Sequence, residues 1–343
     1  MAEKASRAAV FGAFAAVYVI WGSTYLAIRY AIETLPPFLM AGARFLSAGA
    51  VLYLFMRMRG VGAPARVHWR SAFALGGMLL LFGNGAVVWA EHRIASGVAA
   101  LLVAVEPLWI VLLEWLRPGG RRPSARTALG VVLGFAGLVI LVGPADVGGG
   151  RVDLLGSIVV VVAALSWAAG SLYSREAPLP SSPFLATAMQ MLAGGTLLVG
   201  AGLLTGEAGR VEVSAISGRS VAAFAYLAVF GSLVAFTAYI WLLGVVSPSR
   251  ASTYAYVNPL VAVLLGWAVA NEPLSPRVAI SAAVIVGAVA MIISASRATE
   301  SAEAIAEAPM PAPNPAVPEA AATEKMASHR DTETQRRVRR LRL

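Results

Sequence analysis

The stretch VAALLVAVEP (Val98–Pro107) has a later counterpart, RASTYAYVNP (Arg250–Pro259). Each copy is an apolar-rich helical segment with one polar residue, Glu106 or Asn258, directly before a proline. A proline inside a helix removes a backbone hydrogen bond, and its ring clashes with the carbonyl one turn back. In lipid the freed carbonyl needs another partner or a water-filled cavity. We therefore predict a helix kink in each copy. Two such breaks in corresponding places are typical of the binding site of a transporter.

The composition is that of a polytopic membrane protein. Of the 343 residues, 58% are hydrophobic and 13% charged, whereas a soluble domain has about 25% charged residues. Cysteine is absent and the three histidines lie far apart in sequence, so we expect no metal site and no cofactor. The net charge of +9 comes mostly from arginines in short loops and at the C-terminal end. It is better explained by membrane topology than by a nucleic-acid partner.

Ten apolar segments of about 20 residues are long enough to span a membrane. We expect an all-α fold with ten transmembrane helices, and no cleavable signal peptide, because the first apolar run has the length of a span. The predicted helices are Val10–Tyr30, Pro37–Met56, Ser71–Glu91, Ser96–Leu116, Ala125–Val142, Leu154–Ser174, Pro183–Leu204, Val221–Leu243, Ser249–Ala270 and Val278–Ala295.

Arginines in the first half predict the orientation. Alternate loops hold most of them, so the positive-inside rule places both termini in the cytoplasm. In the second half this bias nearly vanishes. The cytoplasmic set in the first half is Lys4, Arg7, Arg57, Arg59, Arg66, Arg70, Arg117, Arg121, Arg122 and Arg126.

An internal repeat divides the chain. Six residues recur 146 positions later, and the dipeptides Phe82-Gly83 and Glu106-Pro107 recur as Phe230-Gly231 and Asn258-Pro259. We predict a first repeat over residues 1–145 and a second over 153–296. Because five helices per repeat is an odd number, the second copy inserts upside down. The six residues are Trp21, Arg29, Pro37, Phe38, Leu39 and Gly49, which recur as Trp167, Arg175, Pro183, Phe184, Leu185 and Gly195.

Residues 297–343 differ in character from the rest. The stretch Glu300–Thr323 is rich in alanine, proline and glutamate, and we expect it to be disordered. Five arginines follow between Arg336 and Arg342. They either attract anionic membrane lipid or form a solvated tail that reinforces topology.

Five stretches resemble one bacterial family, the EamA branch of the drug/metabolite transporter superfamily. The resemblance extends to about Ser296. It implies ten helices in two inverted repeats, a bacterial inner-membrane location, and export of metabolites, with amino acids as one candidate class, or of toxic compounds through a central cavity. The stretches are IWGSTYLAIR (Ile20–Arg29), PPFLMAGARFLSAG (Pro36–Gly49), GNGAVVWAEHRIASGVAAL (Gly83–Leu101), SWAAGSLYSR (Ser166–Arg175) and SPSRASTYAYVNPLVAVLLG (Ser247–Gly266).

The sequence departs from the family in one place. Family repeats commonly carry a glutamate just after the helix that holds the proline. Glu272 fills this place in the second repeat, but the first repeat has Gly120 there. We therefore interpret Glu272 as a capping or loop residue.

Glu106 is the strongest candidate for chemistry. A charged acid at a helix centre costs about 3 kcal/mol to insert, so such residues usually face a cavity or a partner. Glu106 would then exchange a proton or meet a cationic group of the substrate. The alternative is a protonated side chain that bonds a carbonyl freed by Pro107 and only holds the kink.

Seven further residues are candidates for lining the cavity. Trp21 and Trp167 occupy equivalent places in the two repeats and could clamp an apolar or aromatic substrate. Ser249, Ser252 and Tyr256 of the ninth segment would share one inward face. The alternative for the tryptophans is ordinary packing or an interfacial belt position, and for the ninth segment it is hydrogen bonding between packed helices. The seven are Trp21, Tyr25, Asn84, Trp167, Ser252, Tyr256 and Asn258, with the kinks at Pro107 and Pro259.

Other polar residues are assigned to structure. Arg44 lies within the second segment, where it would snorkel or pair with Glu33 or another acid. We interpret Glu91-His92-Arg93 as a charge run at the membrane interface, and Tyr239 as an interfacial or packing residue. Glycines in the fifth and tenth segments fit close helix packing, and either helix could form a homodimer contact. These glycines are Gly130, Gly134, Gly137 and Gly287.

The sequence thus predicts a secondary transporter for a small molecule that works by alternating access. No nucleotide-binding loop ending in Lys-Ser or Lys-Thr is present. A membrane-embedded enzyme acting on lipid or small molecules is the alternative. Such an enzyme needs a converging nucleophile, base and orienting group, and the scarcity of histidine and cysteine argues against it.

Overall fold

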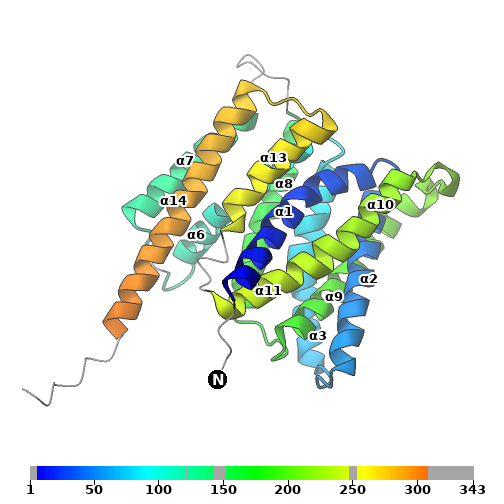
Figure 1. Ribbon diagram of the computed structural model, residues 1–343, viewed down its shortest axis with the longest axis horizontal. Helices are drawn as coiled ribbons and strands as arrows, with labels where there is room; N and C mark the ends of the chain where they lie inside the picture. The colour runs from blue at the N-terminus through cyan, green and yellow to red at the C-terminus, as the bar shows by residue number, and fades with distance from the viewer. Residues whose placement is uncertain (1–5, 121, 143–151, 247–252, 308–343) are drawn as a thin grey trace, which may run out of the picture. The chain divides into compact units, whose positions relative to one another are not determined.

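The computed structural model describes residues 6–120, 122–142, 152–246 and 253–307. The chain divides into two compact units, Met1–Arg297 and Ala298–Leu343. The described residues of the first unit form a bundle of helices and contain no strand (Figure 1). All that follows concerns this unit, apart from the end of its last helix. The predicted Ser249 and Ser252 lie outside the described residues.

Nine helical segments of the described residues are long and apolar enough to cross a membrane. Four of them have the predicted bounds, because Pro, Asp and Ser residues mark their ends. The nine are α1 (Arg7–Ala31), α2 (Pro37–Met58), α3–η1–α4 (Arg66–Ala90), α5–α6 (Ser96–Leu116), α7 (Ala125–Val142), α8 (Leu154–Ser174), α9 (Pro183–Leu204), α10–η4–α11 (Gly218–Leu242) and the start of α14 (Pro276–Ala295).

The ninth predicted segment is a shorter apolar helix, α13 (Tyr254–Ala270). The residues before it, 247–252, lie outside the described part of the chain. Helix α14 spans Pro276–Glu307, so Glu300–Glu307 is helical rather than disordered as the sequence analysis expected.

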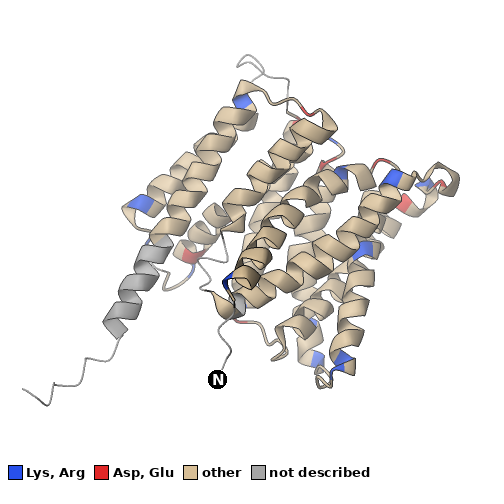
Figure 2. Ribbon diagram, in the orientation of Figure 1, with Lys and Arg blue, Asp and Glu red and all other residues tan. Residues whose placement is uncertain are grey.

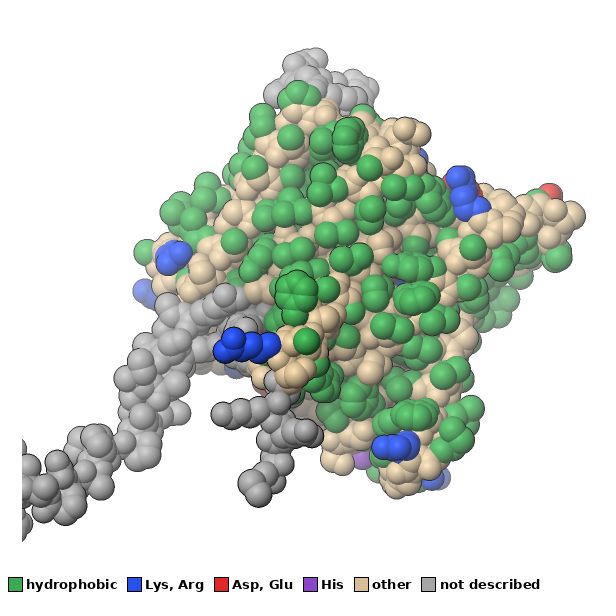
Figure 3. Space-filling model, viewed as in Figure 1, with side chains coloured by type: hydrophobic (Ala, Val, Ile, Leu, Met, Phe, Trp, Pro, Cys, Tyr) green, Lys and Arg blue, Asp and Glu red, His purple; other side chains and the backbone are tan. Residues whose placement is uncertain are grey.

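Side chains are sorted as expected for a bundle in lipid. Large apolar residues such as Phe11, Leu116 and Val139 are more than half exposed, and apolar side chains cover the face seen in Figure 3. Most charged residues lie at helix ends and in loops (Figure 2). Because lipid is itself apolar, packing and buried polar contacts, rather than outward apolar residues, hold such helices together.

Small residues bring α2 and α9 together. A Cβ added at Gly42 would lie 3.0 Å from the carbonyl oxygen of Gly195, and one at Gly49 would lie 3.1 Å from that of Ala188. A Cβ at Gly195 would in turn lie 3.0 Å from the carbonyl oxygen of Gly42. The backbones of the two helices are therefore in direct contact, which larger side chains would prevent.

The predicted glycine packing of α7 is confirmed. A Cβ at Gly130 or Gly137 would lie 2.8 or 2.6 Å from an isoleucine of α14, and one at Gly134 would lie 2.4 Å from Leu108. Gly287 of α14 was expected to pack in the same way. That expectation is wrong, because its Cβ position has no neighbour within 4 Å.

Two segments are π-helical, which the sequence analysis did not predict. They are η1 (Gly76–Gly85), between α3 (Arg66–Leu75) and α4 (Ala86–Ala90), and η4 (Leu227–Val234), between α10 (Gly218–Tyr226) and α11 (Ala235–Val245). They contain the repeated Phe-Gly dipeptides. A π-helix redirects its side chains and carbonyls, and π-helical turns are frequent at functional sites.

The helix contact gives a first prediction. Gly195→Ala should lower the free energy of unfolding by about 1–3 kcal/mol, the usual cost of overpacking, because the new Cβ would meet the backbone nitrogen of Leu46 at 2.9 Å. Thermal unfolding of purified protein in detergent measures this. Gly200→Ala in the same helix is the control, because nothing lies within 4 Å of its Cβ position. Equal midpoints for the two variants would contradict the contact.

Candidate functional site

The fourth span breaks beside the predicted acid. Two residues separate helix α5 (Ser96–Val103) from helix α6 (Glu106–Leu116), and Pro107 lies in the first turn of α6. Proline is tolerated there because it has no N–H to leave unpaired. Pro259 lies inside α13, which continues on both sides of it. The break at Pro107 places Glu106 at the start of a helix, where the helix dipole favours a carboxylate.

Glu106 is half-buried among hydroxyl groups from both halves of the chain. The Ser171 hydroxyl of α8 lies beside its carboxyl group. The same carboxyl group lies within electrostatic range of three tyrosine hydroxyls, those of Tyr25 in α1, Tyr239 in α11 and Tyr254 in α13. Five helices thus meet around one acid. The alternative role of Glu106, holding the kink at Pro107, stays a prediction.

Aromatic rings pack beside this acid. The ring centroid of Trp21 lies 5.1 Å from that of Tyr254, 5.2 Å from that of Tyr239 and 6.2 Å from that of Phe236. We call Trp21, Phe236, Tyr239 and Tyr254 the Trp21 cluster. Edge-to-face and tilted contacts of this kind stabilise aromatic pairs. A carboxylate beside tyrosine and tryptophan rings is a suitable environment for an organic cation.

Sequence reasoning found only part of this site. It selected Trp21, Tyr25 and Glu106, which the structure brings into one region. It assigned Tyr239 to the interface or to packing, and did not single out Tyr254. Both pack against Trp21, and their hydroxyls hydrogen-bond each other. The polar density of the ninth segment was the one sequence signal that could have identified Tyr254.

The other predicted cavity residues are spread around this region. The amide oxygens of Asn84 and Asn258 are buried, and neither has a hydrogen-bond partner among the described residues. Tyr256 packs against the hydrophobic core that contains Leu101 and Leu102. Trp167 packs against Gly83, whose added Cβ would lie 2.8 Å from its ring. The clamp by Trp21 and Trp167 stays a prediction.

Both π-helical segments accept hydrogen bonds from neighbouring helices. The indole N–H of Trp21 donates to the carbonyl oxygen of Gly231 at 3.1 Å, and the Ser166 hydroxyl of α8 donates to that of Met78 at 2.9 Å. Backbone carbonyls at membrane depth need such donors. The two π-helical segments are therefore held by the side chains of Trp21 and of Ser166, which directly precedes Trp167.

Arg44 has a structural environment that the sequence analysis did not predict. Its side chain is buried, and its Nε donates to the hydroxyl of Ser232 in η4 at 2.9 Å. The suggested pairing with Glu33 is wrong, because Glu33 binds Arg219, which donates from its Nε at 3.0 Å. Ser232 directly follows the second Phe-Gly dipeptide, so Arg44 contacts the π-helical segment η4.

Glu272 caps a helix, as predicted. It follows α13, whose C-cap residue Asn271 has a φ of 52°. Its carboxylate accepts from the backbone N–H groups of Ser96 and Gly97 at 2.9 and 3.0 Å, at the start of α5. It also accepts from the Ser96 hydroxyl at 2.8 Å and from Arg29 Nη1 at 2.7 Å. These contacts join α1, α5 and α13 at one end of the bundle.

A second ion pair lies at the other end of the α5–α6 span. Arg175, the repeat counterpart of Arg29, follows α8, and its Nη1 lies 2.6 Å from Oε1 of Glu114 in α6. The side chains of Arg175 and Glu114 are 61% and 40% exposed, whereas that of Glu272 is 7% exposed. Solvent therefore screens the second pair more strongly than the first.

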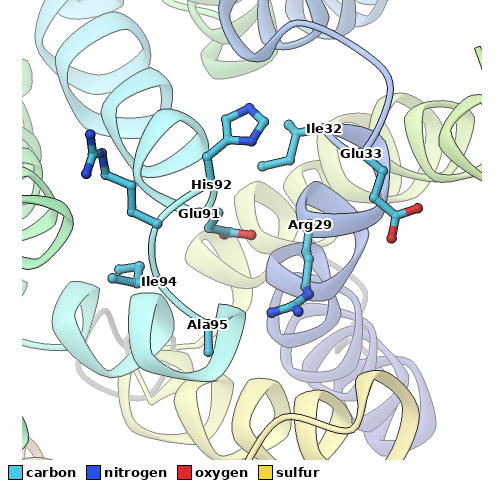
Figure 4. Close-up of a pocket in the computed structure, with 8 residues that line it drawn as sticks. Arg29, Ile32, Glu33, Glu91, His92, Ile94 and Ala95 are labelled. Carbon is cyan, nitrogen blue, oxygen red and sulfur yellow. The ribbon is translucent and has the colours of Figure 1, made fainter. Parts of the chain in front are cut away.

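Glu91 was predicted to belong to an interfacial charge run, and this is wrong. It follows α4, is 5% exposed, and neither of its carboxyl oxygens has a hydrogen-bond partner among the described residues. Figure 4 shows the carboxyl group directed toward α1, while Glu33 points away. Burial raises the pKa of Glu91 well above 4.5, and the neighbouring Glu272 raises it further, while Arg29 opposes both.

Comparisons with known proteins agree with this fold. The model of the EamA-like transporter family matches residues 7–143 and 154–294. The chain is 40% identical over 285 residues to the uncharacterized inner membrane transporter YedA of Escherichia coli K12, an alignment covering 82% of this chain and 90% of YedA. The chain therefore belongs to the EamA-like transporter family, and is a transporter-type membrane protein.

More distant relatives extend this comparison. Protein PecM of Dickeya dadantii is 26% identical over 261 residues, covering 75% of this chain and 82% of PecM. A WAT1-related chloroplastic protein of Arabidopsis thaliana is 25% identical over 280 residues, covering 80% of this chain and 67% of that protein. One crystal structure has the same fold, with a TM-score of 0.56 and 24% identity over 85% of this chain and 100% of that chain.

The cap on α5 gives a second prediction. Glu272→Gln should lower the free energy of unfolding by about 1.5–3 kcal/mol, because hydrogen bonds to a charged group are worth that much. Thermal unfolding in detergent measures it. Glu176→Gln is the control, because the Arg117–Glu176 pair is exposed and such pairs contribute little. A variant at Glu272 as stable as the control would show that the cap is dispensable.

Glu91 gives a third prediction. Its pKa is raised in the folded state, so above pH 4.5 the unfolded chain ionises while the folded chain keeps the proton. Stability should therefore fall as pH rises from 4.5 toward the raised pKa. Glu91→Gln should remove this fall, so that its unfolding midpoint exceeds that of the wild type at pH 8 by more than at pH 5. Parallel profiles for the two proteins would show that Glu91 ionises normally.

Proposed function

We propose that the protein is a secondary transporter that exports small molecules across the bacterial inner membrane by alternating access. The substrates would be metabolites, with amino acids as one class, or drugs. The observation that carries the proposal is the environment of Glu106. An acid at a helix break, beside aromatic rings and hydroxyls contributed by both halves of the chain, suits a ligand with an ammonium group and an apolar body.

Reciprocal contacts support an inverted repeat with ten helices. In the alignment at a spacing of 146, Gly42 corresponds to Ala188 and Gly49 to Gly195. Gly42 contacts Gly195, and Gly49 contacts Ala188. Each glycine of the first repeat therefore contacts the counterpart of the other glycine, and such a reciprocal pair of contacts has two-fold symmetry. The contacts of Trp21 with Gly231 and of Trp167 with Gly83 follow the same rule.

The two ion pairs support alternating access. Each joins one half of the chain to the other, because Arg29 and Glu114 belong to the first half and Glu272 and Arg175 to the second. They lie at opposite ends of the α5–α6 span. The Arg29–Glu272 pair, whose carboxylate is buried, joins the halves at the end near Ser96, and the more exposed Arg175–Glu114 pair at the other end is weaker. If one pair forms while the other breaks, the central site is exposed to the two sides of the membrane in turn.

The family favours a transporter over an enzyme, because relatives such as YedA are named as transporters. The name of YedA includes the inner membrane, which supports the proposed location. The first-half arginines support cytoplasmic termini. Export, rather than import, follows from the resemblance alone and is part of the proposal.

A transport assay gives a fourth prediction. Purified protein in liposomes should carry labelled amino acids or a cationic dye, and Glu106→Gln should reduce the flux of a cationic substrate about 10- to 100-fold, because it removes a charge-assisted contact. Glu176→Gln, on an exposed loop, is the control and should leave flux unchanged. If wild-type protein carries a cation and Glu106→Gln carries it equally well, Glu106 is not part of the substrate site.

A pH gradient in the same assay tests coupling. Flux that the gradient stimulates, and that Glu106→Gln uncouples from it, would place proton exchange at Glu106. Flux indifferent to the gradient would mean a facilitator, with Glu106 serving only to bind substrate.

A further inference from the structure

An open pocket of about 360 Å³ lies at the end of the bundle where α1 ends and α5 begins. Its lining includes Arg29, Glu91 and Ala95 (Figure 4). The Trp21 cluster is not part of this lining. The pocket therefore opens outside the Trp21 cluster, and it contains the buried carboxyl group of Glu91, which lies within electrostatic range of Tyr25 in the central site.

The charges around Glu91 do not balance. Arg29 is engaged by Glu272 at 2.7 Å. Of the other charged residues that line the pocket, Glu33 is bound by Arg219, and Arg93 lies 3.4 Å from Asp153 and over the ring of Trp89. Two buried carboxyl groups, those of Glu91 and Glu272, therefore share one guanidinium group.

A proton resolves this imbalance. A buried carboxylate without a partner is strongly disfavoured, and such a group takes up a proton instead. Glu272 has four donors directed at its oxygens. Glu91 has none among the described residues, so it is the group that holds the proton. The raised pKa of Glu91 agrees with this assignment.

The position of Glu272 links this proton to opening. Glu272 belongs to the second half, whereas Arg29, Glu91 and Ser96 belong to the first. If the halves separate at this end, Arg29 loses Glu272, and Glu91 is the other acid near it. A free guanidinium group stabilises the ionised form of a neighbouring carboxyl group. The proton of Glu91 then passes to water in the pocket, and the carboxylate pairs with Arg29.

We propose that Glu91 is a proton-binding site at this end of the bundle, and that opening this end exchanges the Arg29–Glu272 pair for an Arg29–Glu91 pair with release of one proton. The inference rests on the proposed alternating access. It adds a proton-coupling site outside the central cavity, at Glu91, which does not contact the substrate.

Infrared spectroscopy of the purified, full-length protein tests this without transport. The difference spectrum between wild type and Glu91→Gln at pH 7 should contain the carbonyl band of a protonated carboxyl group, because bands from all other groups cancel. The spectrum of Glu33→Gln, at the rim of the same pocket, should lack this difference. If the wild-type spectrum loses no such band on Glu91→Gln, the proposal is wrong.

Two variants test the exchange of partners, and they should act in opposite directions. Glu272→Gln frees Arg29 and removes a negative neighbour, so the Glu91 band should titrate away at a pH lower by about 1–3. Arg29→Gln removes the stabilising cation, so the band should persist to higher pH. If neither variant moves the midpoint, protonation of Glu91 is not linked to the ion pair. Either variant alone suffices if the other does not fold.

Salt substitution distinguishes a proton from a metal cation. Replacing choline chloride with sodium chloride at fixed pH should leave the Glu91 band unchanged. Loss of the band in sodium would mean that the site binds sodium, and would overturn the proton assignment. Because these spectra need no flux, failure to find a transported compound would count against the proposed function and leave this test intact.

Discussion

A backbone carbonyl or amide freed from a helix must find another partner inside an apolar bundle, because lipid supplies none. The irregular parts of this protein follow from that constraint. Trp21 and Ser166 donate to carbonyls of the two π-helical segments, and Glu272 accepts from the first amides of α5. Each irregularity is thus tied to a side chain from another helix. The same side chains connect the two halves of the chain, so the departures from regular helix are also the contacts between halves.

Charged side chains inside the bundle are also held by contacts between the two halves of the chain. Arg44 is buried and its guanidinium donates to Ser232, while Arg29 is bound by a buried carboxylate. Burial makes a contact strong only when both partners are well placed. The contacts around Glu272 meet that condition with three further donors, which Glu91 lacks. One end of the bundle therefore holds one acid with four hydrogen-bond donors and one acid with none among the described residues.

Apolar length and turn residues predicted the helices well, because a span needs a fixed number of apolar residues whatever its neighbours are. The bounds of α7, α8 and α9 follow from residues such as Asp153 and Pro183 at their starts. The π-helical segments could not be predicted in this way, because one extra residue per turn leaves composition unchanged. The first of them begins at Gly76, which lies against Gly194 of α9, a contact between helices that composition does not specify.

The site shows the same limit. Glu106 was predictable because an acid inside an apolar span is costly wherever it lies. Glu272 was assigned to capping or loop structure from its place after a helix, but the helix that it caps, α5, lies in the other half of the chain and follows from tertiary packing. The Trp21 cluster depends on which faces of α1, α11 and α13 meet, which one sequence does not specify. Glu91 resembled its exposed neighbours His92 and Arg93, and only the turn after α4 directs it inward.

The repeat explains the framework, and the differences between its copies explain the chemistry. Gly42 contacts Gly195, and the corresponding Ala188 contacts Gly49, so both halves contribute alike to this packing. The acids are not shared: Glu106 corresponds to Asn258, and Glu272 to Gly120. A fully symmetric transporter would have equal affinity and equal closing energy at its two ends. Glu106 belongs to the first copy and Glu272 to the second, each without an acidic counterpart, so the two ends of the bundle differ in charge.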